Sequence, residues 1–223
     1  MSAPLTRRSG RRERRLGGVS DHHADDKMYA LFDERAPEYD SYWLGTGSHA
    51  DRDRPGWDEA VEQLIAALQA LPPGRVLDVA CGTGFLTQHL AGEVVALDQS
   101  SRMVEIATAR MPHARVIQAE IPPLPFEDGE FDRVFTSLFF HHLSRDGRAA
   151  FVAEALRVGR ELVVVEDVRH GDAPAEEQRE FVLDDGSHHH MHRHSFTPAE
   201  LGAELGDGKV LHEGRYFVMV TVG

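Results

Sequence analysis

Short apolar runs alternate with amphipathic helical patterns along most of this chain, and this alternation constrains the fold more than any other feature. The expected strands are residues 76–80, 94–97, 116–117, 131–138 and 162–165, and the expected helices between them are residues 85–90, 103–111 and 145–158. Crossovers of this strand–helix–strand kind are right-handed and connect parallel strands. The pattern therefore predicts an α/β fold, with helices on both faces of a mostly parallel sheet.

The two ends of the chain add further elements. Apolar spacing predicts a helix from Met28 that ends before Pro37, and a second helix over residues 57–71. At the C-terminal end, the expected elements are a helix at 197–205 and strands at 210–211 and 216–222.

These elements suggest one domain with a tail. We expect residues 1–26 to form a disordered, basic and polar tail, and residues 27–223 to form the domain. Within it, residues 27–71 are expected to supply N-terminal helices and a lid, and residues 168–196 an insertion that covers the substrate.

Charge and composition exclude several function classes. The chain has 223 residues and a net charge of −13, but residues 1–19 hold six arginines and one acid, so the body alone carries about −18. Such a body repels a phosphate backbone, which argues against nucleic acid as a partner. The single cysteine, Cys81, excludes an internal disulfide framework and fits a reducing, cytoplasmic compartment. The chain contains no apolar run of 18 residues, so we expect no membrane span.

Polar and glycine residues follow the first two strands, at the edge of the sheet where such folds bind ligands. Gly82 and Gly84 allow a tight turn and a close approach of a ligand to the backbone. Asp98 ends the second strand, where a carboxylate can accept hydrogen bonds from both ribose hydroxyls. Asp78 precedes the glycines, where a carboxylate suits an amine and repels pyrophosphate. The expected ligand therefore carries adenosine and a positive charge without phosphate, conditions that S-adenosylmethionine meets.

Four segments together resemble the class I S-adenosylmethionine-dependent methyltransferases, in the small-molecule branch that includes quinone-biosynthesis enzymes. They are VLDVACGTGFLT (76–87), VVALDQSSRMVEIA (94–107), AEIPPLPFEDGEFDRVFTSLFFHHL (119–143) and HSFTPAEL (194–201). The resemblance covers roughly residues 28–223. It implies a Rossmann-like, doubly wound, seven-stranded sheet of order 3-2-1-4-5-7-6, with strand 7 antiparallel and an N-terminal helical lid.

The resemblance also implies the cofactor contacts. Asp78, Gly82 and Gly84 would hold the methionine end, Asp98 the ribose, and Gln99, Met103, Glu120 and Ile121 the adenine; Ser137 and Leu138 would offer carbonyl groups, and Tyr39 would close over the cofactor. The implied cofactor is S-adenosyl-L-methionine, with S-adenosyl-L-homocysteine as the product.

Two histidines follow the fourth strand, next to where the reacting methyl group is expected. Since histidine is the natural base near neutral pH, His141 and His142 are the candidate catalytic residues, and Glu166 and Asp167 are alternative bases. The expected function is methyl transfer to O, N or C of a small organic acceptor. Two alternatives are a protein that binds the cofactor without methylating and a nicotinamide-linked oxidoreductase. A homodimer formed through the N-terminal helices is a further expectation.

A histidine-rich segment, residues 188–194, has no explained role in this scheme. If it is extended, His188, His190, His192 and His194 share one face. The spacing matches no defined metal site, so we assign no metal. We consider both a plain exposed ribbon and a pocket role, in which His190, His192 and His194 contact the substrate together with Tyr42 and Trp43, two aromatic residues that equally fit a core.

Overall fold

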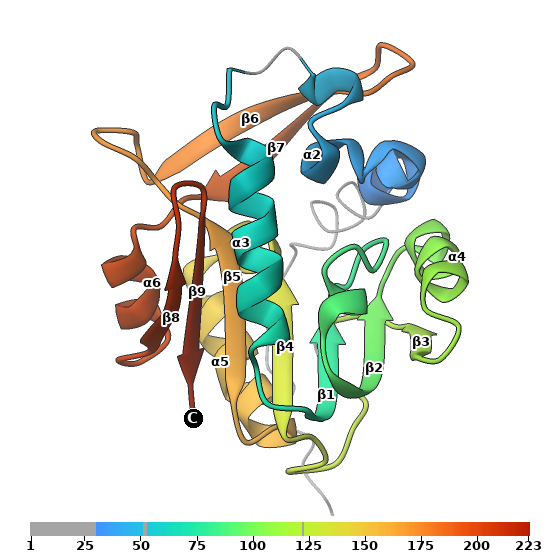
Figure 1. Ribbon diagram of the computed structural model, residues 1–223, viewed down its shortest axis with the longest axis vertical. Coiled ribbons are helices and arrows are strands. Elements are labelled where there is room, and N and C mark those ends of the chain that lie inside the picture. The colour runs from blue at the N-terminus through green and yellow to red at the C-terminus, as the bar shows by residue number, and fades with distance from the viewer. Residues whose placement is uncertain (1–29, 51–52, 122) are drawn as a thin grey trace, which may run out of the picture.

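A seven-stranded sheet forms the centre of the computed structural model, which describes residues 30–50, 53–121 and 123–223 (Figure 1). The sheet order is β3-β2-β1-β4-β5-β9-β8, for the strands β3 (Arg115–Gln118), β2 (Gly92–Asp98), β1 (Gly74–Val79), β4 (Arg133–Ser137), β5 (Leu162–Asp167), β9 (Phe217–Val222) and β8 (Lys209–Glu213). Neighbouring strands from β3 to β5 are parallel, whereas β9 is antiparallel to both β5 and β8. This is the predicted order, with the last two strands renumbered because a hairpin precedes them.

Helices cover both faces of this sheet. The helices are α2 (Ser41–Leu44), α3 (Trp57–Gln69), α4 (Ser101–Arg110), α5 (Arg145–Val158) and α6 (Pro198–Glu204), and the 3₁₀ turns are η1 (Ala36–Glu38), η2 (Gly47–His49), η3 (Thr87–His89) and η4 (Phe140–His142). Apolar residues of α3 and α4 pack on one face, and those of α5 and α6 pack on the other. The alternation of side chains along each strand supplies both cores, since successive residues point to opposite faces.

Two local differences from the sequence prediction stand out. The helix expected at residues 85–90 is reduced to the single turn η3, because the chain turns at Gly84 and must already enter β2 at Gly92. The predicted insertion contains a two-stranded hairpin of β6 (Glu176–Val182) and β7 (His188–His194), which the sequence did not show as a pair.

The hairpin and the N-terminal segment lie over the carboxyl ends of the parallel strands. Figure 1 shows β6, β7 and α2 together at that end of the sheet. A bridge between Val168 and Phe196 joins the two ends of the insertion, and β7 packs against η4. Within the described residues, no helix has the length and apolarity needed to cross a bilayer. The predicted tail, residues 1–26, lies outside them.

Candidate functional site

The loop after β1 has the backbone geometry that its glycines predicted. Gly82 and Gly84 have φ angles of +56° and +75°, a region that L-residues rarely adopt. A Cβ atom on Gly84 would lie 2.7 Å from Met111 Cε, so the flexible end of that methionine would have to shift, and the positive φ is the main reason for glycine here. Ala80 and Leu138, which follow β1 and β4, have positive φ angles without being glycine. Such strained backbone is commonly found at functional sites.

Asp78 is the most unusual charged residue in this loop region. Its side chain is 1% exposed, and the Thr87 hydroxyl donates a hydrogen bond of 2.6 Å to Oδ2. Its other oxygen, Oδ1, is buried without a partner. Burial raises the pKa of Asp78 to about 8, against the opposing effect of the Thr87 hydrogen bond. A buried acceptor left unsatisfied is costly, so this atom is placed to receive a donor from a ligand.

Asp98 lies opposite this loop, at the end of β2. The backbone N–H groups of Gly82 and Ser100 donate hydrogen bonds of 2.8 and 2.9 Å to its two carboxylate oxygens. Burial raises its pKa, and these N–H groups oppose that shift. A carboxylate has about four acceptor positions, so Asp98 keeps capacity for two hydroxyl donors.

The residues predicted to contact adenine are placed unevenly. Met103 is buried at the start of α4, and Ile121 is buried in the main core. The Gln99 side-chain amide donates to the Ile121 carbonyl at 3.3 Å, which brings these two residues together. Glu120 is exposed and has no contact that fixes its side chain in the described part of the chain. Its adenine contact stays a prediction.

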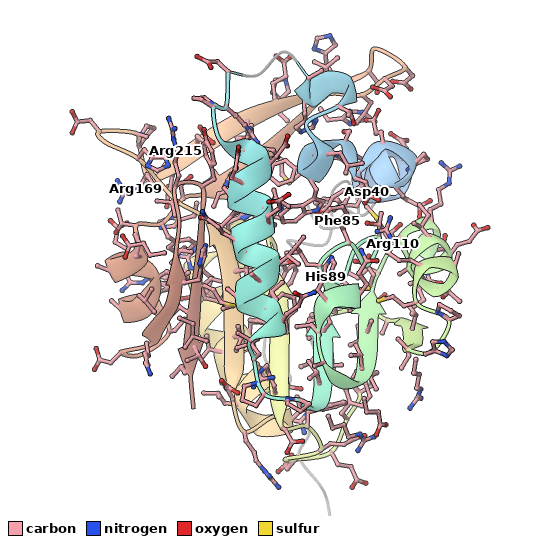
Figure 2. All side chains as sticks on the ribbon, in the orientation of Figure 1. Asp40, Phe85, His89, Arg110, Arg169 and Arg215 are labelled. Atoms are coloured by element: carbon pink, nitrogen blue, oxygen red, sulfur yellow. The ribbon has the colours of Figure 1, made fainter. Side chains whose placement is uncertain are left out.

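Side chains of the N-terminal segment contact the glycine loop after β1 and the start of α4. Asp40 accepts a hydrogen bond of 2.5 Å from the Thr83 hydroxyl and an ion pair from Arg110 of α4. Figure 2 labels Asp40 and Arg110, which point toward one another between the N-terminal segment and α4. Asp33 accepts a bond of 2.7 Å from the Ser100 hydroxyl at the start of the same helix. No local sequence pattern indicates these contacts, because each joins residues far apart in the chain.

Tyr39 lies between this segment and the glycine loop. A Cβ atom on Gly82 would lie 3.3 Å from Tyr39 Cε1, so the ring is packed directly on the loop. Burial raises the pKa of Tyr39 to about 12, which keeps its hydroxyl protonated. Its role in closing over the cofactor stays a prediction.

Ser137 ends β4 at the same edge and Leu138 follows it, and a chain of three titratable side chains comes next. Glu166 Oε2 lies 2.5 Å from His141 Nδ1, and His141 Nε2 lies 2.9 Å from His142 Nε2. His142 Nδ1 is buried and has no hydrogen-bond partner. The two predicted catalytic histidines and one of the alternative bases are therefore members of one hydrogen-bonded chain.

The pKa values in this chain are shifted in opposite directions. Burial raises the pKa of Glu166 to about 8. Burial lowers the pKa of His141 and of His142 well below the usual value, and the positive charge of Arg193 lowers both further. Both imidazoles are therefore neutral near pH 7, as a base requires.

Asp167, the other alternative base, is already paired. It accepts a hydrogen bond from the Tyr42 hydroxyl and an ion pair from Arg193 of β7. Burial alone would raise the pKa of Asp167, but Arg193 and Tyr42 lower it below its usual value. A carboxylate stabilised in this way is a poor proton acceptor. Arg193 was not among the residues selected from the sequence, because it lies within the histidine-rich segment and only the histidines were considered there.

Alternation along β7 separates the histidine run into two faces. His188, His190 and His192 are exposed, whereas Met191 and Arg193 are buried toward the site. His194 is half-buried, with its ring 4.6 Å from that of Phe196. The face that the histidines share is therefore mainly the outer face of β7. Of the β7 side chains, Met191 and Arg193 are thus better placed as site residues than His190 and His192. No cluster suited to a metal ion occurs among the described residues.

Tyr42 and Trp43, for which a core role and a substrate contact were both considered, are placed differently. Trp43 is 3% exposed and stacks on Phe85 with ring centroids 5.3 Å apart, so it belongs to the core. Trp57 Nε1 donates a hydrogen bond of 3.0 Å to the Trp43 carbonyl. Tyr42 also packs on this core, but its hydroxyl reaches Asp167 at the site.

Comparisons with known proteins agree with this geometry. Residues 76–161 match the family described as "Methyltransferase domain". A demethylmenaquinone methyltransferase of Renibacterium salmoninarum is 36% identical over 149 residues, which are 63% of this chain and 59% of that protein. A 2-phytyl-1,4-naphtoquinone methyltransferase of Trichormus variabilis is 34% identical over 121 residues, 48% of this chain and 49% of that protein. The chain thus spans about half the length of these curated relatives.

Solved structures extend the likeness over most of the chain. DhpI, solved as a complex with SAH, has a TM-score of 0.67 and 26% identity, and the match covers 91% of this chain and 97% of that one. The same protein is also known as a SAM–HEP complex. A SAM-dependent methyltransferase from Aquifex aeolicus shares the fold, with a TM-score of 0.55, 21% identity and coverage of 85% and 96%. In its sheet order, its site loops and these matches, this chain is similar to the class I S-adenosylmethionine-dependent methyltransferases, including members of their small-molecule branch.

Proposed function

We propose that this chain is a methyltransferase that uses S-adenosylmethionine to methylate an oxygen, nitrogen or carbon atom of a small organic acceptor. The observation that carries the proposal is the convergence at one sheet edge of two kinds of group. Asp78 and Asp98 have acceptor capacity for an ammonium group and for ribose hydroxyls, and the pair His141–His142 follows β4 at the same edge of the sheet.

The residues present fit this cofactor. Asp78 Oδ1 is a buried acceptor without a partner, which suits an ammonium group. Asp98 can accept two ribose hydroxyls beyond its two backbone bonds. Gly82 and Gly84 leave the loop without Cβ atoms where a ligand would approach. When bound, the cofactor supplies a methyl group made electrophilic by its attachment to a sulfonium.

The chain of Glu166, His141 and His142 can remove the acceptor's proton. With Glu166 ionised, His141 Nδ1–H donates to Glu166 and His142 Nε2–H donates to His141 Nε2, so His142 Nδ1 carries a lone pair. His142 Nδ1 takes the proton from the acceptor, Nε2–H passes its proton to His141 Nε2, and Nδ1–H of His141 passes its proton to Glu166. The raised pKa of Glu166, about 8 because of burial, suits it as the final proton acceptor.

The surrounding elements have a supporting role in this proposal. The N-terminal segment and the β6–β7 hairpin cover the carboxyl edge of the sheet (Figure 1), where they would exclude water and align the acceptor. The strongly negative body supports a small molecule rather than nucleic acid as the acceptor. The single cysteine, which is buried, is consistent with a cytoplasmic location. No observation on the described residues favours a homodimer over a monomer.

Acceptor-dependent product formation tests the proposal. The protein is incubated with S-adenosylmethionine and a panel of small alcohols, phenols, amines and enols, and S-adenosylhomocysteine is measured. We expect its formation to depend on an acceptor, and His142→Asn to slow it by about 10²–10⁴-fold. His113→Asn, at an exposed position, is the matched control. Cofactor binding without product from any acceptor would favour the alternative of a protein that binds the cofactor and does not methylate.

The pH dependence tests the proton path separately. Because Glu166 must be ionised to receive the proton, kcat/KM should rise about tenfold per pH unit below its pKa of about 8 and level off above it. Glu166→Gln should lower the plateau and remove this rise. A rise that persists unchanged in Glu166→Gln would contradict the proton path.

A further inference from the structure

The acceptor end of the site contains a buried arginine that is incompletely satisfied. Arg193 of β7 is 7% exposed. One terminal nitrogen pairs with Asp167, and Nε is buried without a partner. Asp167 also accepts a hydrogen bond from the Tyr42 hydroxyl, so Arg193 shares this carboxylate with Tyr42. A buried donor of a charged group without an acceptor is costly, which points to an absent partner.

Two more guanidinium groups lie near Arg193. Arg35 is 8% exposed, and its guanidinium carbon lies 5.1 Å from the ring centroid of Tyr39. Arg179 is half-buried on β6, and its pKa is lowered by burial and then by the positive charge of Arg193. The pKa of His142 is lowered by burial, by His141 and by the charges of Arg193 and Arg35, and a hydrogen bond with the His192 backbone opposes this shift. Two of the guanidinium groups, those of Arg193 and Arg35, therefore act on the proposed base.

Carboxylates also act on these arginines. Asp167 acts on Arg193 and Arg179, the exposed Glu177 acts on Arg179, and Glu38 acts on Arg35. The three guanidinium groups are thus matched by three carboxylates in number. The unmet requirement is a hydrogen bond, since the Nε–H of Arg193 is buried without an acceptor. A charged oxygen is the strongest acceptor for such a donor.

Resting on the proposed methyltransferase function, we propose that the acceptor carries an oxyanion, a carboxylate or a phosphoryl group, and that Arg193 binds this group beside the nucleophile that His142 deprotonates. The planar guanidinium offers Nε–H and a terminal N–H side by side, the fork that suits two oxygens of one oxyanion. The Nε–H group of Arg193 has no partner and can donate to one oxygen of the oxyanion. The terminal N–H pairs with Asp167, so the second oxygen of the oxyanion would compete with that carboxylate.

Anion binding to the complex with S-adenosylhomocysteine tests this proposal. Benzoate, phenyl phosphate and the neutral analogue benzamide are titrated into that complex by calorimetry. At least one anion should bind tenfold or more tightly than benzamide, and the comparison of the two anions distinguishes the carboxylate from the phosphoryl source. Arg193→Gln should weaken that binding by about 10- to 100-fold. Arg215→Gln is the control, because this exposed arginine, which Figure 2 labels, donates to the Pro55 carbonyl.

A second variant separates electrostatics from loss of structure. Asp167→Asn removes the competing carboxylate, so it should tighten anion binding, whereas general damage to the site would weaken it. Equal binding of benzamide and both anions, or unchanged anion binding in Arg193→Gln, would overturn the proposal. Titration of S-adenosylhomocysteine alone distinguishes failure of this proposal from failure of the proposed function. Arg193→Gln should bind S-adenosylhomocysteine like the wild type. A wild type that fails to bind it would refute the proposed function.

Discussion

Asp78→Asn should stabilise the protein without cofactor and weaken cofactor binding at the same time. The carboxyl group is ionised in the unfolded chain at pH 7, because its pKa there is about 3.9. In the folded protein burial raises that pKa to about 8. Protonating the group at pH 7 therefore costs about 4 kcal/mol of folding free energy. Asparagine avoids this cost but leaves an amide partly unsatisfied, at about 1–3 kcal/mol.

The net expectation is a gain of about 1–3 kcal/mol at pH 7, or roughly 3–9 °C in Tm. The cost to the wild type is absent below the unfolded pKa of about 3.9, grows as the pH rises, and becomes constant above about 8. The gain from Asp78→Asn should therefore be small at pH 5 and full at pH 8. Thermal unfolding at both pH values measures it, with the exposed Asp172→Asn as control.

Calorimetry on the same variant measures the functional half of this prediction. Loss of the charged acceptor for the cofactor's ammonium should weaken S-adenosylhomocysteine by about 10- to 100-fold. A variant that is destabilised equally at pH 5 and pH 8, or that binds the ligand like the wild type, would refute the reasoning about Asp78.

Three further predictions concern the loop, the N-terminal segment and the hairpin. Gly84→Ala should cost about 1–2 kcal/mol of stability because of its φ of +75°, measured by denaturant unfolding. Arg110→Ala removes an ion pair to Asp40, so amide exchange in residues 36–44 should accelerate while that in α5 stays unchanged; equal protection in both proteins would argue against this attachment. The double variant of His190→Asn and His192→Asn should leave kcat/KM within about twofold, because both side chains are exposed; a tenfold loss would place them at the substrate.

The strands of the central sheet could be predicted because their signals are local. Each is a short apolar run; β1 ends at Val79, just before the glycine loop, and β2 and β5 end at Asp98 and Asp167. The resemblance to a known family then supplied the strand order. The hairpin could not be predicted in the same way, because the polar sequence of β6 has no clear two-residue apolar alternation.

The position of a candidate site residue in the fold could be predicted where the residue stands at or soon after the end of a strand. Asp98 ends β2, and the glycine loop and His141–His142 follow β1 and β4, so their edge of the sheet follows from topology. The pairing of Arg193 with Asp167 joins a hairpin to the sheet, and no local pattern shows it. The histidine run was correctly given a shared face, but only the fold shows that this face points outward.

The most direct test of the account is a calorimetric titration of S-adenosylhomocysteine into the wild type and Asp98→Asn, with EDTA present. Asparagine keeps one acceptor oxygen but loses the charge and the acceptor capacity that two ribose hydroxyls need. The account predicts one binding site per chain in the wild type and an affinity lower by about 10- to 100-fold in the variant. Absence of binding by the wild type, or equal affinity in both proteins, would contradict a nucleoside pocket at this edge of the sheet.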